Sequence, residues 1–123
     1  MNTGRLTTIA PDIFRKRLII EGFFRRDVDA ETLREFFAHI TTALGLRTYA
    51  APIVHSTGGE GKAANQGYDA FVPLIDSGIY IGVWSGRRFL STILYTCAEF
   101  DETRAVALVR DFFDFQEHQA ALF

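Results

Sequence analysis

The sequence predicts an α+β domain, a two-layer sandwich in which two helices cover one face of a mostly antiparallel sheet. Two stretches carry apolar residues at helical spacing, one in the first half of the chain and one near its end. Five short apolar or β-branched runs lie around them, separated by turn residues. Strands joined by hairpins form antiparallel sheets, and two helices can cover only one face.

Composition excludes several classes of protein. At 123 residues the chain is expected to be one domain, residues 1–123. Apolar residues make up 48% and aromatic residues 14%, which excludes a disordered chain. A net charge of −2 gives no basic stripe for duplex DNA. The basic clusters at residues 15–17 and 25–26 flank a strand and are interpreted as solvated edge charge rather than a phosphate site.

Cysteine content and hydropathy indicate a compartment. Cys97 is the only cysteine, so no internal disulfide forms and a reducing environment is expected. No apolar run approaches the ~20 residues of a membrane span, and residues 1–11 do not form a secretory signal. We therefore expect a soluble, cytoplasmic protein. The abundance of aromatic residues suggests that some are buried between subunits.

The first half of the chain contains a strand, a helix and a second strand. A short β-branched run predicts a strand over 17–22. Asp29 is a favourable N-cap and Gly45 a favourable stop, so the helix is expected over 30–44. The second strand is expected over 48–54, where Pro52 indicates a sheet edge or a bulge.

A glycine-rich loop follows at 56–67. Its Gly61-Lys62 pair suggests a Walker phosphate loop, which needs Ser or Thr next and a helix after it. Ala63 follows instead, and the next element is a strand, so we reject the phosphate loop.

The second half of the chain predicts three strands and a helix. The strands are expected over 68–75, 79–84 and 89–96. A turn over 76–78 joins the first two, and a four-residue hairpin loop over 85–88 joins the last two. Asp101 caps the final helix, which is expected to fray toward His118 and Phe123.

The hairpin brings chemically interesting residues together. If Trp84 pairs with Phe89, Asp76 faces Cys97, and Ser77 lies beside that thiol. Tyr80, Gly82, Trp84 and Cys97 then share one face of the sheet. Asp-Ser-Gly is also ordinary turn chemistry, and a lone cysteine is often a small buried apolar residue. The residues alone leave both interpretations open.

With these residues the chain resembles the small prokaryotic S-adenosylmethionine decarboxylases, over roughly residues 17–113. The family has Gln-Gly before one strand, Glu-Ser before the next, a Trp inside it, and Thr-Cys ending the return strand. The matching residues here are Gln66-Gly67, Asp76-Ser77, Trp84 and Thr96-Cys97. The twenty-residue spacing from Ser77 to Cys97 also matches.

The resemblance implies roles for these residues. Ser77 would attack the preceding carbonyl, and cleavage would convert it into a pyruvoyl cofactor. Cys97 would protonate the decarboxylated carbon, with Asp76 and Asp69 beside the chemistry. The implied ligand-binding residues are Gln66, Gly67, Tyr80, Trp84 and His55. No other cofactor is expected, and no metal, because His39, His55 and His118 are scattered.

The departures from the family pattern concern proton transfer. Gly78 stands where the family has a histidine directly after the reactive serine. Gly82 stands where the family has a histidine before the Thr-Trp pair. Asp69 stands where the family has a serine that assists processing, and Ser85-Gly86 stands where the family has Pro-Glu. Losing one general acid–base group costs about 10²–10⁴-fold in rate. His55 is the candidate for a substitute proton shuttle, and His39 is expected on a helix surface.

Three functions stay open. The favoured one is a catalytically impaired relative of the decarboxylases that does not process itself. It would bind a small molecule such as S-adenosylmethionine, or regulate an active relative in polyamine metabolism. It would form a homodimer through the open sheet face. The alternative is an active pyruvoyl-dependent decarboxylase of S-adenosylmethionine or an amino acid, cleaved between Asp76 and Ser77. The third is an interaction domain that uses its aromatic face. No nucleic-acid or membrane partner is expected.

Overall fold

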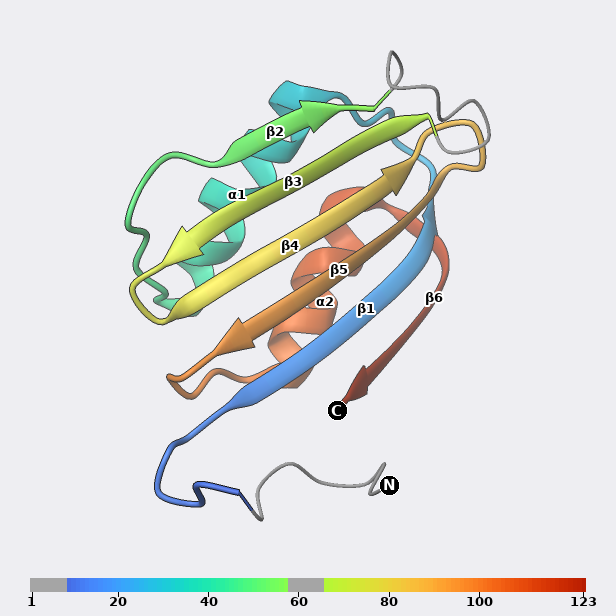
Figure 1. Cartoon of the computed structure of the whole chain (residues 1–123). Coiled ribbons are helices and arrows are strands. Elements are labelled where there is room, and N and C mark those ends of the chain that lie inside the picture. The colour runs from blue at the N-terminus through green and yellow to red at the C-terminus, as the bar shows by residue number, and fades with distance from the viewer. Residues whose placement is uncertain (1–8, 58–65) are drawn as a thin grey trace.

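A computed structural model describes residues 9–57 and 66–123 of the chain. Its sheet has the strand order β2-β3-β4-β5-β1-β6, and every neighbouring pair is antiparallel (Figure 1). The elements in chain order are β1 (Lys16–Phe24), α1 (Ala30–Leu44), β2 (Ile53–Ser56), β3 (Gly67–Leu74), β4 (Ser77–Trp84), β5 (Phe89–Thr96), α2 (Glu102–Phe113) and β6 (Phe115–Leu122).

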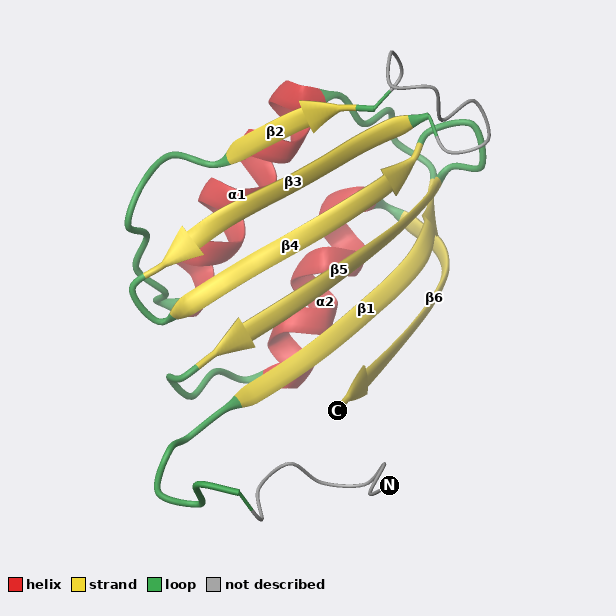
Figure 2. Ribbon diagram, in the orientation of Figure 1, coloured by secondary structure: helices red, strands yellow, loops and turns green. Residues whose placement is uncertain are grey.

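Both helices lie on the same side of the sheet, which confirms the predicted two-layer α+β sandwich (Figure 2). The core lies between the layers and is closed by phenylalanines of the two helices. Phe36 of α1 lies 4.7 Å from Phe113 of α2, measured between ring centroids. Neither helix in the described part of the chain is long and apolar enough to cross a membrane.

Helix α1 has the bounds that its caps predict. The Asp29 side chain accepts a hydrogen bond from the Thr32 N–H, and the Thr32 hydroxyl accepts one from the Asp29 N–H. This reciprocal box satisfies two amide groups that the first turn would leave unpaired. At the other end, Gly45 adopts the left-handed conformation, with φ of 69°, which glycine tolerates at no steric cost.

The predicted register of the β4–β5 hairpin is confirmed. Trp84 pairs with Phe89, and the ladder continues to Ser77 opposite Thr96. One step further, the Cys97 N–H donates a 2.8 Å hydrogen bond to the carbonyl of Asp76. The four-residue loop 85–88 therefore sets which side chains share each face of the sheet.

The prediction for the C-terminal segment was wrong. Instead of fraying, α2 ends at Phe113, and Asp114 turns the chain with φ of 52°. Residues 115–122 then form β6, so His118 lies in a strand. The segment has few β-branched residues, and the strand forms because the free edge of β1 accepts it along the ladder from Leu18↔Leu122 to Phe24↔Phe115.

Two other predictions needed correction. The second strand covers residues 53–56 rather than 48–54, and Thr48 makes only an isolated bridge to Leu74. Pro52, which has no N–H to donate, directly precedes the strand that does form. Ser77 was expected in the turn, but it is the first residue of β4, so the turn is tighter than predicted.

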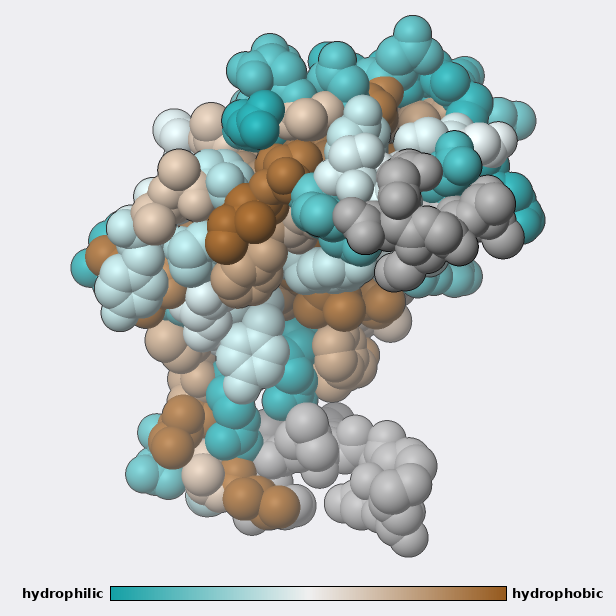
Figure 3. Space-filling model, turned by 45° about the horizontal axis from the view of Figure 1, so that its top comes forward, coloured by the Kyte–Doolittle hydropathy of each residue, from teal (hydrophilic) through white to brown (hydrophobic). Residues whose placement is uncertain are grey.

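The face of the sheet opposite the helices, here called the open face, carries large apolar side chains. Phe23, Phe71, Tyr80 and Tyr95 are each 38–41% exposed on it. In Figure 3, brown and pale side chains occupy the middle of the visible surface, and teal side chains gather along its upper margin. The open face thus combines uncovered apolar area with the hairpin that the sequence singles out.

Candidate functional site

The corner before β4 is the strained part of the candidate site. Ser77 has φ of 131°, a conformation that residues with a side chain rarely adopt. The carbonyl before it, on Asp76, accepts the N–H of Cys97 at 2.8 Å. Attack of the Ser77 hydroxyl on that carbonyl would place negative charge on an oxygen that already has one donor. The Cys97 thiol itself is exposed.

Asp76 is held by an arginine that the sequence did not single out. Its Oδ1 lies 3.0 Å from Nη2 of Arg47, and its Oδ2 accepts from Nε of the same guanidinium at 3.5 Å. These hydrogen bonds, aided by the charge of Arg47, lower the pKa of the Asp76 carboxyl. Asp76 therefore stays ionised at neutral pH and orients the corner rather than donating a proton.

A hollow of about 360 Å³ opens on the open face beside this corner. Aromatic and aliphatic side chains from β3, β4 and β5 form most of its wall. Its lining residues are Phe71, Ser77, Gly78, Tyr80, Ile93 and Tyr95. This volume lies in the range of small-molecule sites, which are mostly apolar with a few polar groups.

Aromatic groups occupy the space above Gly78 and Gly82, the two glycines at positions where the resemblance implies histidines. A Cβ built on Gly78 would lie 2.6 Å from the ring of Phe71. A Cβ built on Gly82 would lie 2.7 Å from the hydroxyl oxygen of Tyr80. Neither position has room for an imidazole unless its aromatic neighbour moves.

The Tyr80 hydroxyl donates a 2.9 Å hydrogen bond to Oδ1 of Asp69. Burial, that hydrogen bond and the nearby negative charge raise the pKa of Tyr80 to about 12. The phenol is therefore neutral at physiological pH and acts as a donor. Asp69, which stands where the resemblance implies a serine, therefore acts as the hydrogen-bond acceptor for Tyr80.

Asp69 belongs to a polar row that crosses the whole open face. The ladder pairs His55 with Asp69, Asp69 with Gly82, and Gly82 with Ser91. It continues from Ser91 to Glu21 and from Glu21 to Gln119. Glu21 accepts hydrogen bonds from the Ser91 hydroxyl at 2.9 Å and from Nε2 of Gln119 at 3.2 Å.

The row is separate from the strained corner. Gly82 follows Ser77 by five residues on one strand, which is roughly 17 Å at about 3.3 Å per residue. Asp69 lies opposite Gly82 and is equally remote. Groups at 69 and 82 could serve the Ser77 carbonyl only if they came from a second copy of the chain.

The predicted ligand-binding residues fall at both ends of β4. Tyr80 lines the hollow at Ser77, whereas Trp84 lies at the far end of the strand. Gly67 pairs with Trp84, and Gln66 is exposed just before it. His55 is exposed on β2, opposite Asp69. The Gly61-Lys62 pair lies outside the described residues.

Four further residues of the site were missed from the sequence. Phe71, Ile93 and Tyr95 line the hollow, and Arg47 holds Asp76. Strand alternation places the first three on the open face with Tyr80, so the pairing register could have found them. Nothing local indicates Arg47, because it reaches Asp76 from a loop twenty-nine residues earlier.

Comparisons with known proteins agree with this fold. No family model matches the chain, and no curated protein does. Among solved structures, the crystal structure of the adenosylmethionine decarboxylase from Aquifex aeolicus VF5 is similar, with a TM-score of 0.68 and 16% sequence identity. The match covers 90% of this chain and 89% of that one. The chain therefore has the fold of an adenosylmethionine decarboxylase, as the resemblance of its motifs predicts.

Proposed function

We propose that this protein is a relative of the S-adenosylmethionine decarboxylases that does not cleave itself and binds a small molecule on its open face. The observation that carries the proposal is the filling of both imidazole positions, by Phe71 over Gly78 and by Tyr80 over Gly82. Self-cleavage requires a proton to leave the serine hydroxyl and another to reach the departing amide. Neither glycine has a side chain that can carry a proton. Tyr80 stays protonated at neutral pH, because its pKa is raised to about 12, so it cannot accept the proton of the serine hydroxyl.

Intact-mass spectrometry of freshly purified protein tests this proposal. We expect one mass, that of the uncut 123-residue chain, and the same mass after days at 37 °C. A Ser77→Ala variant provides the reference for a chain that cannot form an ester. Two fragments that meet between Asp76 and Ser77, with a blocked N-terminus on the second, would refute the proposal.

One observation favours the second candidate, an active pyruvoyl-dependent decarboxylase of S-adenosylmethionine or an amino acid. Ser77 is strained, and the Cys97 N–H polarises the carbonyl that it would attack. These features supply the attacking hydroxyl and a hydrogen-bond donor for the oxyanion of an N-to-O acyl shift, but no group that transfers the proton. The same mass measurement decides between the candidates, because the active enzyme must be cut.

S-adenosylmethionine is the ligand that we propose for the hollow beside Ser77. Its adenine ring can stack on the rings of Tyr80 and Tyr95, and its sulfonium cation is attracted to aromatic faces. At a ligand concentration about 100 times Kd, mass action stabilises the folded state by about 2.7 kcal/mol, which raises Tm by several degrees.

A thermal-shift titration with S-adenosylmethionine measures this effect. The Tyr95→Ala variant should lose most of the shift. Tyr49 is 71% exposed and outside the hollow, so Tyr49→Ala should keep it. A wild-type Tm that does not move at millimolar ligand would count against this ligand.

We also propose a homodimer that joins the open faces of two copies. The uncovered apolar side chains of that face support it, and so does the roughly 17 Å between Ser77 and the row at Gly82, which a second copy could bridge. Sedimentation velocity at micromolar concentration should show a dimer, and Phe71→Glu should shift it to monomer. A wild-type protein that sediments only as a monomer contradicts this part of the proposal. In the cell such a protein would act on S-adenosylmethionine or polyamine metabolism by binding the ligand or by pairing with an active relative.

A further inference from the structure

We propose that the outer edge of β6 pairs with the same edge of a second copy, which joins two sheets into one continuous antiparallel sheet. In the described part of the chain β6 ends the strand order, and β1 is its one neighbour (Figure 1). This edge lies beside the open face rather than on it, so the pairing uses a different surface from the face-to-face dimer. The proposal depends neither on self-cleavage nor on a bound ligand.

Alternate residues of β6 present their backbone groups to the outside of the sheet. The Phe123 N–H donates a 3.1 Å hydrogen bond to the carbonyl of Arg17, and the same register continues along the ladder between β1 and β6. Hydrogen-bonded pairs alternate in an antiparallel ladder. Residues 117, 119 and 121 therefore bond to β1, whereas His118, Ala120 and Leu122 direct their N–H and carbonyl groups outward.

β6 lacks the features by which proteins keep an edge strand from pairing, which are short length, proline, lysine and bulges. It has 8 residues without proline, lysine or glycine, and all of them except Phe115 are exposed. Its register shift against β1 lies at the start of the strand, opposite Phe23 and Phe24. The other edge of the sheet is protected, because β2 has only 4 residues and follows directly after Pro52.

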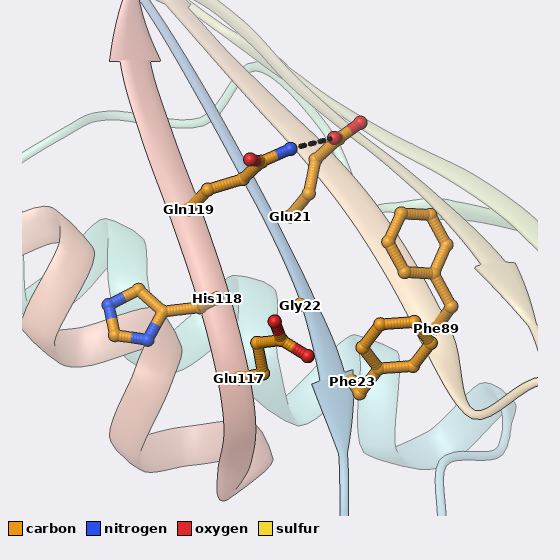
Figure 4. A pocket seen from close by; sticks show the side chains of 7 residues that line it. All are labelled: Glu21, Gly22, Phe23, Phe89, Glu117, His118 and Gln119. Carbon is orange, nitrogen blue, oxygen red and sulfur yellow. Dashed lines mark hydrogen bonds between the residues drawn. The ribbon is translucent and has the colours of Figure 1, made fainter.

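The side chains of β6 allow a second strand to approach. Glu117 and Gln119 project to one side of the strand and His118 to the other (Figure 4). Ala120 is small, so the middle of the strand carries no bulk on that second side. Leu122 is 48% exposed, and pairing would cover part of its apolar surface.

A two-fold axis at Gln119 sets the register of the pairing. Residue 119 is the midpoint of the exposed run 116–122, so every residue of that run meets a residue of the partner. His118 then lies opposite the partner's Ala120, and the outward backbone groups of the two residues bond to each other. Gln119 lies opposite the partner's Gln119, and their side-chain amides can also hydrogen-bond.

Charge favours this register. Glu117 is the only carboxylate of β6, and like charges directly opposite each other destabilise a strand pair. Here Glu117 faces the partner's Ala121, so the two Glu117 residues lie four residues apart, which is roughly 13 Å along the strand. Exposed charges at that distance are largely screened at physiological salt, where the Debye length is about 8 Å. The strand is therefore complementary to a second copy of itself.

The pairing closes after two copies, because the same surface is used on both sides. Its area is small, since one strand meets one strand, and small interfaces are weak. We expect a Kd of about 100 µM to 1 mM. At micromolar concentration the edge is then open, so the sedimentation test of the open-face dimer is unaffected. A wild-type monomer in that test would refute the open-face dimer and leave this proposal standing.

Sedimentation equilibrium of the Phe71→Glu variant, which removes the open-face dimer, measures the edge pairing. We expect fewer than about a tenth of the chains to be dimeric at 5 µM, and about a third or more at 500 µM. Ala120→Pro in that background should stay monomeric at both concentrations, because proline removes an outward N–H at the centre of the interface. Ala120→Val keeps that N–H and should associate as the parent does. Circular dichroism verifies that the variants are folded.

Cysteine cross-linking tests the register without a proline. The background is Phe71→Glu with Cys97→Ser, which leaves no native thiol. Gln119→Cys places two thiols across the axis, within reach of a disulfide, and oxidation at 500 µM should give a covalent dimer. Gln116→Cys is the matched control, because its two thiols would lie roughly 20 Å apart. The proposal is overturned if Phe71→Glu stays monomeric at 500 µM, if Ala120→Pro associates as tightly as Ala120→Val, or if both cysteine variants cross-link equally.

Discussion

Replacing Gly67 with alanine should lower the free energy of unfolding by about 3 kcal/mol or more. A Cβ at this position would lie 1.9 Å from the carbonyl oxygen of Val83 and 3.1 Å from the backbone nitrogen of Ser85. Both atoms are backbone, so no side-chain rotation relieves the clash, and β3 must move away from β4. The displacement would also break the two hydrogen bonds between Gly67 and Thr57, at 2.9 and 3.0 Å.

Urea unfolding followed by circular dichroism measures this change as a lower midpoint with a similar slope. Gly86 is the matched control, because a Cβ built on it meets no atom within 4 Å. Gly86→Ala should stay within about 0.5 kcal/mol of the wild type. Equal midpoints for Gly67→Ala and Gly86→Ala would contradict the close approach of β3 to β4.

Replacing Phe36 with alanine should cost about 3–5 kcal/mol, the usual range for a fully buried phenylalanine. Phe36 is 0% exposed and joins the two helices of the covering layer. Its ring centroid lies 4.7 Å from that of Phe113, 5.4 Å from that of Phe112 and 5.7 Å from that of Phe37. Truncation leaves a cavity between α1 and α2 that the sheet behind them cannot fill.

Thermal unfolding should therefore give a Tm lower by about 9–15 °C, from 3–5 kcal/mol at roughly 3 °C per kcal/mol for a chain of this length. Phe14 is 45% exposed, and Phe14→Ala removes the same atoms from the surface, so its Tm should stay close to that of the wild type. If Phe36→Ala and Phe14→Ala have the same Tm, the packing of the two helices around Phe36 does not stabilise the fold as expected. Both helices cover the face opposite the hollow beside Ser77, so this variant tests the scaffold separately from the site.

The local sequence predicted α1 with its observed bounds, because Asp29, Thr32 and Gly45 satisfy the helix ends through near neighbours. It also predicted the β4–β5 register, because a four-residue loop leaves one pairing that keeps Leu90, Thr92 and Leu94 on the helix side of the sheet. These interactions involve residues close in sequence, so the local pattern contains the needed information.

The sequence also singled out Ser77 as a candidate site residue, from the resemblance of its motifs, whereas the strain at Ser77 was found only in the structure. It placed glycines, Gly78 and Gly82, where the resemblance implies histidines. It could not show that Phe71 and Tyr80 occupy the space above these glycines, because that depends on side chains from a neighbouring strand and from two residues away on the same strand.

Tertiary structure alone decided β6, the Arg47–Asp76 pair and the separation of Ser77 from the polar row. Residues 115–122 have weak strand propensity, and they become a strand because β1 presents an unpaired edge. Arg47 reaches Asp76 across twenty-nine residues of sequence. Hydrophobic spacing and caps are local and could be read along the chain, whereas edges, ion pairs and hollows form only where distant segments pack together.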